Sequence, residues 1–365
     1  MKTKILILGD LYPKSVKETP TLPANDFCIA NLECTITDKK HAILKDGPSL
    51  KIPTDRISVL KSLNVNLVGL ANNHVADYGF DGLQDTVNAL IENGIEFAGC
   101  SLGKNYAIKN INNIIFGFYF VAEHQYNNNV NVLEEKRCLD EIKDLKQKSD
   151  FVFVFFHGGK EYYKYPTPLQ QINCYKFVDS GANFVICQHS HCVGCKETYH
   201  GAEIIYGQGN FIFPYKDLDD FKSGLILQLE FEDSKTYKVS YIPTVHLEEN
   251  IVRLASNEES EKILADFTKC SNDLTNKTAE LLYDAMVDEY GLDFLYRLFN
   301  KSKLFVRLDT SRLFKNRMMK RYIKKNQKFI LYLYNYFNCE THVEYIKTIL
   351  AKQIKQGESK WKRFV

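Results

Sequence analysis

Long hydrophobic runs are missing from this sequence. No stretch of about 18 apolar residues, the length that spans a membrane as a helix, occurs without a charged residue. Near the start, Ile5–Leu8 is too short for a membrane span or for the apolar part of a signal peptide. The sequence therefore predicts no membrane-spanning segment, and we expect a cytoplasmic location.

A strong net charge is also missing, because 47 Lys and Arg residues are balanced by 45 Asp and Glu residues, which leaves a net charge of +2. That balance gives no overall basis for binding nucleic acid. The positive charge is concentrated in residues 301–328, which hold eleven Lys or Arg residues and one acid, Asp309. A basic helix there would suit a peripheral contact with anionic lipid on the inner face of the membrane, a phosphorylated substrate, or an ordinary solvated surface.

A disulfide framework is missing as well, although the sequence has ten cysteines. Most of them stand within apolar runs, as Cys28 does, where a buried thiol is expected. Cys192 and Cys195 lie beside His189 and His191, so a structural zinc is an alternative there. A zinc ribbon needs a second pair at similar spacing, which the sequence lacks, and we expect these cysteines to pack under a loop.

Up to about residue 215 the sequence consists of short β-rich runs that alternate with helical patterns. Several runs are continuously apolar, as in strands buried on both faces. The alternation predicts an α/β domain with a layered sheet. The expected strands are Ile5–Leu8, Phe27–Ala30, Val65–Leu70, Ile114–Val121, Phe151–Phe156, Phe184–Cys187 and Ile204–Tyr206, and the expected helices are Thr54–Leu63, Gly82–Asn93, Leu139–Gln147 and Pro168–Ser180.

The pattern changes towards the end of the chain. Leu225–Phe231 and Tyr237–Tyr241 alternate apolar and polar residues around a polar turn, and they predict a hairpin that completes the sheet. Beyond about residue 255 only helical patterns are found. We therefore expect an α/β domain over 1–250 and a helical region over 256–365. The expected helices of that region are Glu258–Cys270, Thr275–Glu289, Leu292–Phe299, Arg312–Phe337 and Val343–Lys355.

Two carboxylates stand directly after expected strands. Asp10 follows Ile5–Leu8 and a glycine, and Glu33 follows the apolar run that begins at Phe27. Ligands of open parallel sheets gather at the carboxyl ends of the strands, so both side chains are expected at one edge. An ordinary Gly-Asp turn is the alternative for Asp10, and a solvated edge position is the alternative for Glu33. Because a buried carboxylate needs a partner, Glu33 is a candidate bridge between two metal ions.

Asn72, Asn73, His74 and Asp77 crowd the turn that follows Val65–Leu70. An amide oxygen is an acceptable ligand for a hard or borderline metal. The neighbouring histidine could protonate a leaving oxygen or stabilise charge on it. A structural histidine is the alternative, but four polar groups in one turn favour a functional site.

Three further histidines follow the most apolar runs. His157 ends Phe151–Phe156 and precedes two glycines, which let a ligand approach the backbone closely. His189 and His191 follow Phe184–Cys187, and in extended backbone their side chains would point to the same side and serve two neighbouring metals. Carboxylates, an amide and imidazoles at one sheet edge are the ligand types of a two-metal hydrolytic site.

In their order these motifs resemble the bacterial capsule-synthesis family of poly-γ-glutamate biosynthesis proteins, which is similar to the calcineurin-like metallophosphoesterases. The resemblance covers roughly residues 4–245, and as an ordered series it is specific. The segments that carry it are Gly9-Asp10, Ala30–Glu33, Ala71–Gly79, His157–Tyr162, Pro166–Gln170, Asp179–Asn183, His189-Ser190-His191, Glu197–Tyr199 and Gly209–Phe211.

The resemblance implies a four-layer α/β/β/α sandwich, similar to the metallophosphoesterases, with a helical C-terminal region. It also implies two divalent metal ions between the loops, for which manganese is favoured over iron or zinc. The implied ligands are Asp10 and His191 for one ion, Asn73, His157 and His189 for the other, and Glu33 as the bridge.

The same resemblance implies a reaction in which a hydroxide between the two cations attacks phosphorus in line. His74 would act at the leaving group, with Asp77 as its catalytic partner. Asn72, Glu161 and Asn210 are the expected substrate contacts.

The sequence departs from these families at several positions. Asp10 is followed by Leu11 and Tyr12, where the phosphoesterases usually have Asp-x-His, so the first metal would have one imidazole fewer. The bridging carboxylate is Glu33 rather than Asp. Gly158 stands where the capsule family commonly has Trp, so an aromatic side chain is missing at that position.

Three functions fit these observations. The first is a metal-dependent phosphoesterase that acts on a phosphorylated sugar or on an intermediate of capsule or surface-polysaccharide biosynthesis. The second is an amide hydrolase that uses the same site on a γ-glutamyl polymer. The third is a non-catalytic assembly factor that the basic stretch 301–328 recruits to a membrane. We favour the phosphoesterase, because ligand-type residues follow several separate strands.

Overall fold

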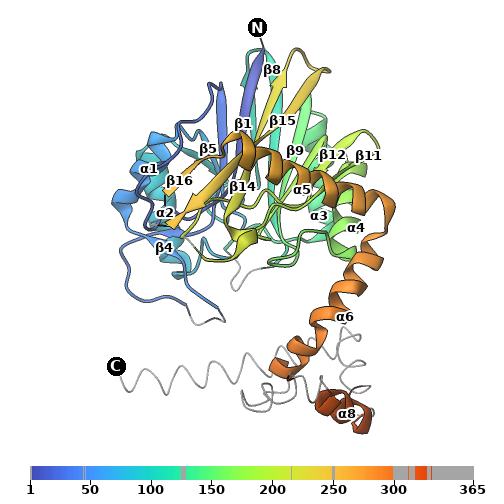
Figure 1. The fold of residues 1–365 in the computed structure, drawn as a ribbon. Coiled ribbons are helices and arrows are strands. Elements are labelled where there is room, and N and C mark those ends of the chain that lie inside the picture. The colour runs from blue at the N-terminus through green and yellow to red at the C-terminus, as the bar shows by residue number, and fades with distance from the viewer. Residues whose placement is uncertain are drawn as a thin grey trace. The chain divides into compact units, whose positions relative to one another are not determined.

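Two stacked β-sheets form the frame of the fold (Figure 1). This computed structural model describes residues 2–43, 45, 47–124, 129–214, 216–248, 251–298, 311, 317–326 and 330. The first sheet has the order β16 (Ile251–Leu254), β15 (Tyr237–Leu247), β14 (Ser223–Phe231), β1 (Thr3–Leu11), β2 (Phe27–Leu32), β5 (Leu67–Gly69) and β6 (Glu96–Ala98), and β13 (Asn210–Ile212) pairs with the end of β1.

The second sheet has a central group of parallel strands. Strand β9 pairs in parallel with β8 and with β10, and β12 pairs in parallel with β10. The edge strands β7 and β11 are antiparallel to their neighbours. The order is β11 (Lys196–Tyr199), β12 (Ala202–Ile205), β10 (Phe184–Gln188), β9 (Phe151–His157), β8 (Ile114–Ala122) and β7 (Tyr106–Ile111), while β3 (Thr35–Ile36) and β4 (Lys51–Ile52) form a separate small pair.

Strand β9 shows why its apolar run is continuous. Phe151, Phe153 and Phe155 belong to the core between the two sheets, whereas Val152 and Val154 belong to the core on the other face. Successive residues of a strand point to opposite faces, so both faces of the second sheet are buried. The continuously apolar runs therefore correspond to strands that are covered on both sides, as we expected.

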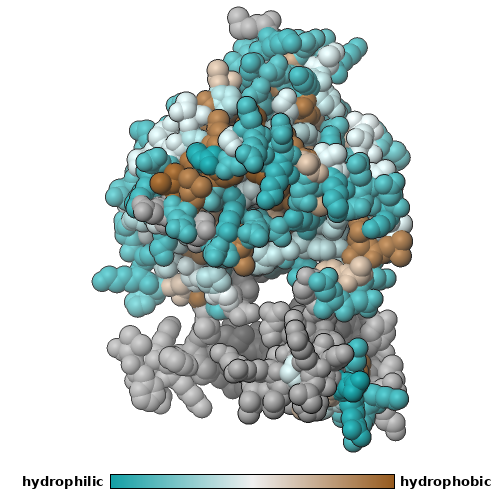
Figure 2. Space-filling view, viewed as in Figure 1, coloured by the Kyte–Doolittle hydropathy of each residue, from teal (hydrophilic) through white to brown (hydrophobic). Residues whose placement is uncertain are grey.

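Helices cover the outer face of each sheet. Helices α1 (Ile57–Ser62), which follows the short η1 (Thr54–Arg56), and α2 (Gly79–Glu92) pack with the first sheet, and α3 (Glu135–Lys146) and α4 (Pro168–Asp179) pack with the second (Figure 1). The predicted four-layer α/β/β/α sandwich is thereby confirmed. On the face seen in Figure 2, hydrophilic residues predominate and hydrophobic ones form only small separate groups.

Helix α5 (Asn257–Asn276) begins at a capping box made by Ser256 and Glu259 and contacts β11 and β15. The expected end of this helix at Cys270 is wrong, because Leu274 in the next turn is also buried and the helix continues to Asn276. The sandwich and α5 lie in a compact unit, Met1–Tyr283. The expected domains 1–250 and 256–365 stay a prediction.

The remaining chain, Asp284–Val365, clusters as a second unit. Of the expected helices Thr275–Glu289 and Leu292–Phe299, the first two residues belong to α5, and the described residues from Ala279 onward form one helix, α6 (Ala279–Leu298). Of the basic stretch 301–328, the described residues are 311 and 317–326, which include α8 (Arg317–Lys325), and the expected helix Val343–Lys355 lies outside the described residues. In the described parts of the chain, no helix combines the length and the apolar character that crossing a membrane requires.

Gly9 permits β1 to run very close to the turn before β13. A Cβ atom at Gly9 would lie 2.3 Å from the carbonyl oxygen of Gly209. We expect Gly9→Ala to lower the free energy of unfolding by about 1–3 kcal/mol, because backbone must move to relieve the clash. Urea unfolding would measure this. Gly103→Ala is the control, since its nearest neighbour is the edge of the Phe97 ring, which can shift, and equal losses in both variants would contradict the explanation.

Candidate metal centre

The carboxyl ends of strands from both sheets converge on one buried cluster of polar side chains. Asp10 lies at the end of β1, and Glu33 directly follows β2 in the first sheet. His157 ends β9, and His189 and His191 follow β10 in the second sheet. Their ligand atoms form two overlapping groups, each within 4.8 Å, which are Glu33 with His157 and His189, and Asp10 with Glu33 and His191.

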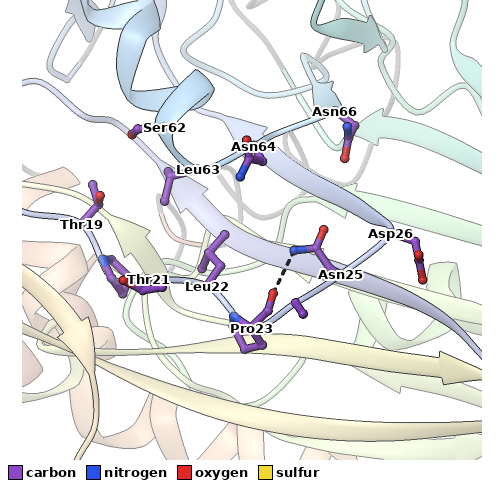
Figure 3. A pocket seen from close by; sticks show the side chains of 12 residues that line it. Thr19, Thr21, Leu22, Pro23, Asn25, Asp26, Ser62, Leu63, Asn64 and Asn66 are labelled. Atoms are coloured by element: carbon purple, nitrogen blue, oxygen red, sulfur yellow. Dashed lines mark hydrogen bonds between the residues drawn. The ribbon is translucent and has the colours of Figure 1, made fainter.

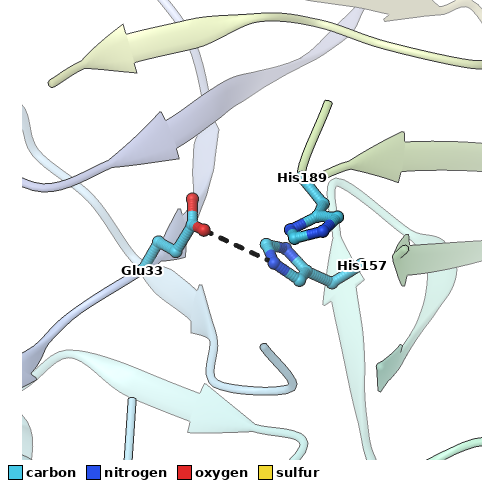
Figure 4. Close-up of side chains that lie close together, drawn as sticks. All are labelled: Glu33, His157 and His189. Atoms are coloured by element: carbon cyan, nitrogen blue, oxygen red, sulfur yellow. Dashed lines mark ion pairs between the residues drawn. The ribbon is translucent and has the colours of Figure 1, made fainter. Parts of the chain in front are cut away.

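The first group is the one drawn in Figure 4, where the two imidazoles from the second sheet approach Glu33 from the first. Nε2 of His157 lies 3.5 Å from Oε1 of Glu33 and 2.9 Å from Oδ1 of Asn73. The ring centres of His157 and His189 are 4.9 Å apart. The amide oxygen of Asn73 therefore reaches the same group.

The second group surrounds the carboxylate of Asp10. Oδ2 of Asp10 lies 3.4 Å from Nδ1 of His191 and accepts a hydrogen bond of 3.2 Å from the backbone N–H of His189. Nε2 of His191 lies 3.8 Å from Oε1 of Glu33. Glu33 is thus the residue that the two groups share.

Glu33 has the environment expected of a carboxylate that bridges cations. Its side chain is fully buried, and neither of its oxygens has a hydrogen-bond partner. Burial raises the pKa of Glu33 well above its usual range, and the nearby charge of Asp10 raises it further. A buried carboxylate without a partner is costly, and bound cations would remove that cost. The donor set therefore fits divalent metal ions.

The histidines differ strongly in their protonation. Burial lowers the pKa of His157 to about 4 and lowers that of His189 well below its usual value. Both rings are therefore neutral near pH 7, which is the form that binds a metal. Burial would also lower the pKa of His191, but Glu33 and Asp10 outweigh it and raise this pKa to about 9. Without a metal, the positive charge of protonated His191 partly balances the negative charges of Glu33 and Asp10.

The backbone around His189 and His191 is not extended, so our expectation for their side-chain directions rested on a wrong conformation. Their φ angles are +100° and +57°, in the region that residues with a side chain seldom adopt. The two left-handed residues bend the chain after β10 and aim the two rings at different groups. Such backbone strain is typical of functional sites.

Asn31 and Asn210, which come from β2 and β13, hold the ligands in position. The amide of Asn31 donates 2.8 Å to Oδ1 of Asp10 and lies 3.2 Å from Nδ1 of His157. Oδ1 of Asn210 lies 2.9 Å from Nδ1 of His191. Partners of this kind orient metal ligands and fix their tautomers. Asn31 lies in the segment Ala30–Glu33 that carries the family resemblance, but it was not among the expected site residues.

His74 forms a hydrogen-bonded set with Asp77 and Lys45. Nδ1 of His74 lies 2.7 Å from Oδ2 of Asp77 and 3.1 Å from Nζ of Lys45. Lys45 also forms an ion pair with Asp77, and both side chains are almost completely buried. Burial lowers the pKa of His74, against the opposing effect of Asp77, and Lys45 and His157 lower it further. With Nδ1 occupied, Nε2 is the ring atom left for proton exchange.

The three expected substrate contacts lie in different surroundings. The amide of Asn72 is buried, with Oδ1 accepting from the N–H groups of His74 and Val75 and Nδ2 donating to Asn31 and Leu32. Asn72 therefore shapes the turn, and Asn210 is buried against His191. Glu161 is half exposed, and its Oε1 lies 4.0 Å from Nε2 of His189. A substrate contact by any of them stays a prediction.

His124 is a site residue that we did not expect. It follows β8, the parallel neighbour of β9, and its exposed ring lies 5.9 Å from the ring of His189. The signal was its position two residues beyond an apolar strand, which is weaker than that of His157, since His157 directly ends its strand. A histidine there can contact a substrate that enters beside His189.

Cysteines take no part in either group. The described cysteines are all free and buried, and Cys195 belongs to the core on the outer side of the second sheet. Among the described residues, the groups of potential metal ligands contain no cysteine. This agrees with cysteines that pack under the loop rather than with a structural zinc.

A pocket of about 460 Å³ lies elsewhere, beside the starts of β2 and β5 (Figure 3). It is lined by residues such as Thr21, Asn64 and Asn66, and its single carboxylate, Asp26, accepts a hydrogen bond from the backbone of Lys4. It offers no group of catalytic or metal-binding side chains. The buried cluster at the opposite strand ends is therefore the candidate site.

Two solved structures align with this chain at low similarity. A phosphatase from Mycoplasma pneumoniae has a TM-score of 0.44 and 14% sequence identity over 73% of this chain and 99% of its own. A 5'-nucleotidase precursor from Thermus thermophilus has a TM-score of 0.40 and 12% identity over 74% of this chain and 59% of its own.

Two relatives are similar in sequence. The capsule biosynthesis protein CapA of Bacillus anthracis is 28% identical over 244 residues, which are 62% of this chain and 59% of the relative. The PGA biosynthesis protein CapA of Bacillus subtilis is 29% identical over 208 residues, 53% of this chain and 55% of the relative. The chain thus spans little more than half of these relatives. The sequence model of the bacterial capsule synthesis proteins PGA_cap matches residues 14–215, more than half of the chain, and the chain therefore belongs to this family.

Proposed function

We propose that this protein is a metal-dependent hydrolase that cleaves a phosphoester in a phosphorylated sugar or another intermediate of capsule or surface-polysaccharide biosynthesis. The observation that carries the proposal is Glu33, a fully buried carboxylate without hydrogen-bond partners that is shared by two groups of ligand-type residues. A manganese cofactor and a cytoplasmic location belong to the same proposal.

Six residues of the site would bind the metal ions. Asp10, Glu33, His157, His189 and His191, with the amide of Asn73, would hold two divalent cations, which when bound polarise a phosphoryl oxygen and lower the pKa of water.

His74 is placed to transfer a proton. Its Nδ1 is held by Asp77, which fixes the ring. The ring acts in its protonated form, in which Nε2 gives a proton to the leaving oxygen and afterwards takes one up from water. Lys45 holds Asp77 in place through their buried ion pair. Glu161 and His124, at the exposed side of His189, would contact the substrate.

The test combines metal content with turnover. Protein purified without a metal-affinity tag would be loaded with manganese, analysed by mass spectrometry for metal, and assayed with a generic aryl phosphate. We expect about two metals per chain and manganese-dependent hydrolysis. His189→Ala should lower both the metal content and the rate, because it removes a ligand of the first group. His200→Ala, which changes an exposed histidine paired with Asp179, is the control.

A second candidate is the amide hydrolase, which is favoured by the similarity to a relative named a PGA biosynthesis protein. It predicts the same metal content, no hydrolysis of phosphoesters and release of glutamate from poly-γ-glutamate. A protein that takes up no metal after loading and turns over neither substrate would contradict both hydrolases and support the assembly factor.

A further inference from the structure

Three aromatic rings stand around His191, a member of the second group of ligands. The ring of Phe213 lies 4.8 Å from that of His191, the ring of Phe221 lies 5.7 Å away, and the ring of Tyr162 lies 6.2 Å away. We call these three residues the aromatic wall. Phe221 is fully buried, whereas Tyr162 is 43% exposed, so the wall extends from the ligands to the surface.

The position of Tyr162 is set by its backbone. Its φ angle of +58° lies in the left-handed region, and its N–H donates 2.8 Å to the carbonyl of Ser190, between the two histidine ligands. This contact fixes the loop after β9 to the loop after β10. A strained residue that is tied to the ligand loop and exposed is in a suitable place to contact a substrate.

Lys216 lies against the outer part of this wall. Its Nζ donates 3.1 Å to the hydroxyl of Tyr162 and lies 4.6 Å from the centre of the Phe221 ring. It is also 5.7 Å from the centre of the Tyr162 ring. Aromatic faces attract cations, so these contacts hold the ammonium group in place without neutralising its charge.

The charge of Lys216 differs from that of its neighbours. Lys164 is paired with Asp220 and Asp266, and Lys222 is paired with Asp217 and Asp219. Within the described part of the chain, by contrast, no carboxylate lies within ion-pair distance of Lys216. An exposed cation that is positioned by rings and has no carboxylate partner among the described residues is available to an anion from outside.

We propose that Lys216 and Tyr162 form a second anion subsite at the exposed edge of the metal centre. The subsite takes a carboxylate or phosphoryl group that the substrate carries in addition to the group that is cleaved. The Tyr162 hydroxyl accepts from Lys216 and so keeps its own hydrogen to donate, and the ammonium keeps further hydrogens. Two adjacent donors suit two oxygens of one anionic group. The inference rests on the proposed function for the position of the cleaved group.

The test measures Kd by calorimetry on the full-length, manganese-loaded protein with probes that cannot be hydrolysed. The pair is 5-phosphonopentanoate and its neutral amide, which differ only in the distal charge. We expect the carboxylate to bind about tenfold more tightly than the amide, because a charge-assisted hydrogen bond at an exposed site is worth about that factor. Lys216→Met should reduce the ratio to about one, Lys216→Glu should invert it, and Tyr162→Phe should reduce it in part.

Lys136→Met is the matched control, because Lys136 is exposed and paired with Asp140 on α3, away from the site, and it should keep the wild-type ratio. Equal Kd values for the two probes in the wild type, no binding of either probe, or a ratio that survives Lys216→Met would overturn the subsite. Butane-1,4-diylbisphosphonate distinguishes a carboxylate from a phosphoryl group as the natural occupant of the subsite. If its Kd is lower than that of 5-phosphonopentanoate, the occupant is a phosphoryl group. If the wild-type protein shows the expected Kd ratio but does not hydrolyse aryl phosphate, the proposed function is rejected and the subsite is retained.

Discussion

Replacing Glu33 with Gln is expected to remove the metal and at the same time to stabilise the metal-free protein. The carboxylate is shared by both groups of ligands, so its loss should lower metal content in both and reduce turnover by at least about 100-fold. In the metal-free protein the same carboxylate is fully buried without a hydrogen-bond partner. Removing its charge should therefore raise the free energy of unfolding by about 1–3 kcal/mol at pH 8.

The gain should depend on pH in a definite direction. Burial raises the pKa of Glu33 in the folded protein, while the unfolded chain keeps the usual value of about 4.3. Below that pH the carboxyl is protonated in both states and has no effect on stability. As pH rises towards the raised pKa, the unfolded state loses its proton first and the metal-free wild type is destabilised. The difference between the variant and the wild type should therefore be absent near pH 4 and grow towards pH 8.

Urea unfolding in the presence of a chelator, at several pH values, measures this difference. Glu197→Gln is the matched control, because that carboxylate accepts hydrogen bonds from Tyr175, Tyr206 and Gln171, and its loss should bring no gain. If the Glu33 variant were less stable than the wild type at pH 8 without metal, the ion pair of Glu33 with protonated His191 would outweigh the cost of burying the carboxylate, and the argument for a cation there would fail.

Replacing His74 with Asn is expected to reduce kcat by about 100-fold to 10,000-fold, which is the usual contribution of a positioned acid or base. Metal content should stay near that of the wild type, because His74 belongs to neither group of ligands. Asp77→Asn should reduce kcat less, since it loosens the hold on Nδ1 but leaves the ring present. Steady-state kinetics with aryl phosphate, together with mass spectrometry of the metal, would measure both effects.

The control for His74 is His200→Asn, which changes a histidine that also contacts an aspartate but is exposed. Its kcat should equal that of the wild type. A His74 variant with full kcat would exclude the imidazole from the proton transfer. A variant that lost its metal as well would show instead that His74 supports the ligands through Asn73.

The main strands could be predicted because their burial on both faces requires apolar runs. Strands β9 and β10 are examples, and the predicted boundaries differ from the observed ones by a single residue at the carboxyl end of each. Strands β3 and β13 could not be predicted, because two or three residues carry too little pattern and their pairing depends on distant partners. Strand β7 was not predicted, although the sequence contains a signal for it. Asn112-Asn113, with positive φ at both residues, is a two-residue hairpin turn between β7 and β8.

The candidate site could be predicted as far as it depends on strand ends. Asp10, Glu33 and His157 each end or follow a recognisable apolar run, and the structure brings them together. Lys45 could not be predicted, because it comes from a loop whose path over His74 is set by tertiary contacts. The roles of Tyr162 and Lys216 could not be predicted for a related reason. Their roles depend on a strained φ angle and on ring contacts that no spacing in the sequence encodes.

Each group of ligands has members from both sheets, so neither group is complete until both sheets have folded. Glu33 and Asp10 come from the first sheet, whereas the histidines come from the second sheet and lie more than a hundred residues further along the chain. A half-folded chain with one sheet formed thus offers an incomplete ligand set. Under the proposed function, metal binding would therefore require both sheets to be folded. Bound ions would in turn stabilise the packing of the two sheets, since a ligand that binds the folded state alone adds to its stability.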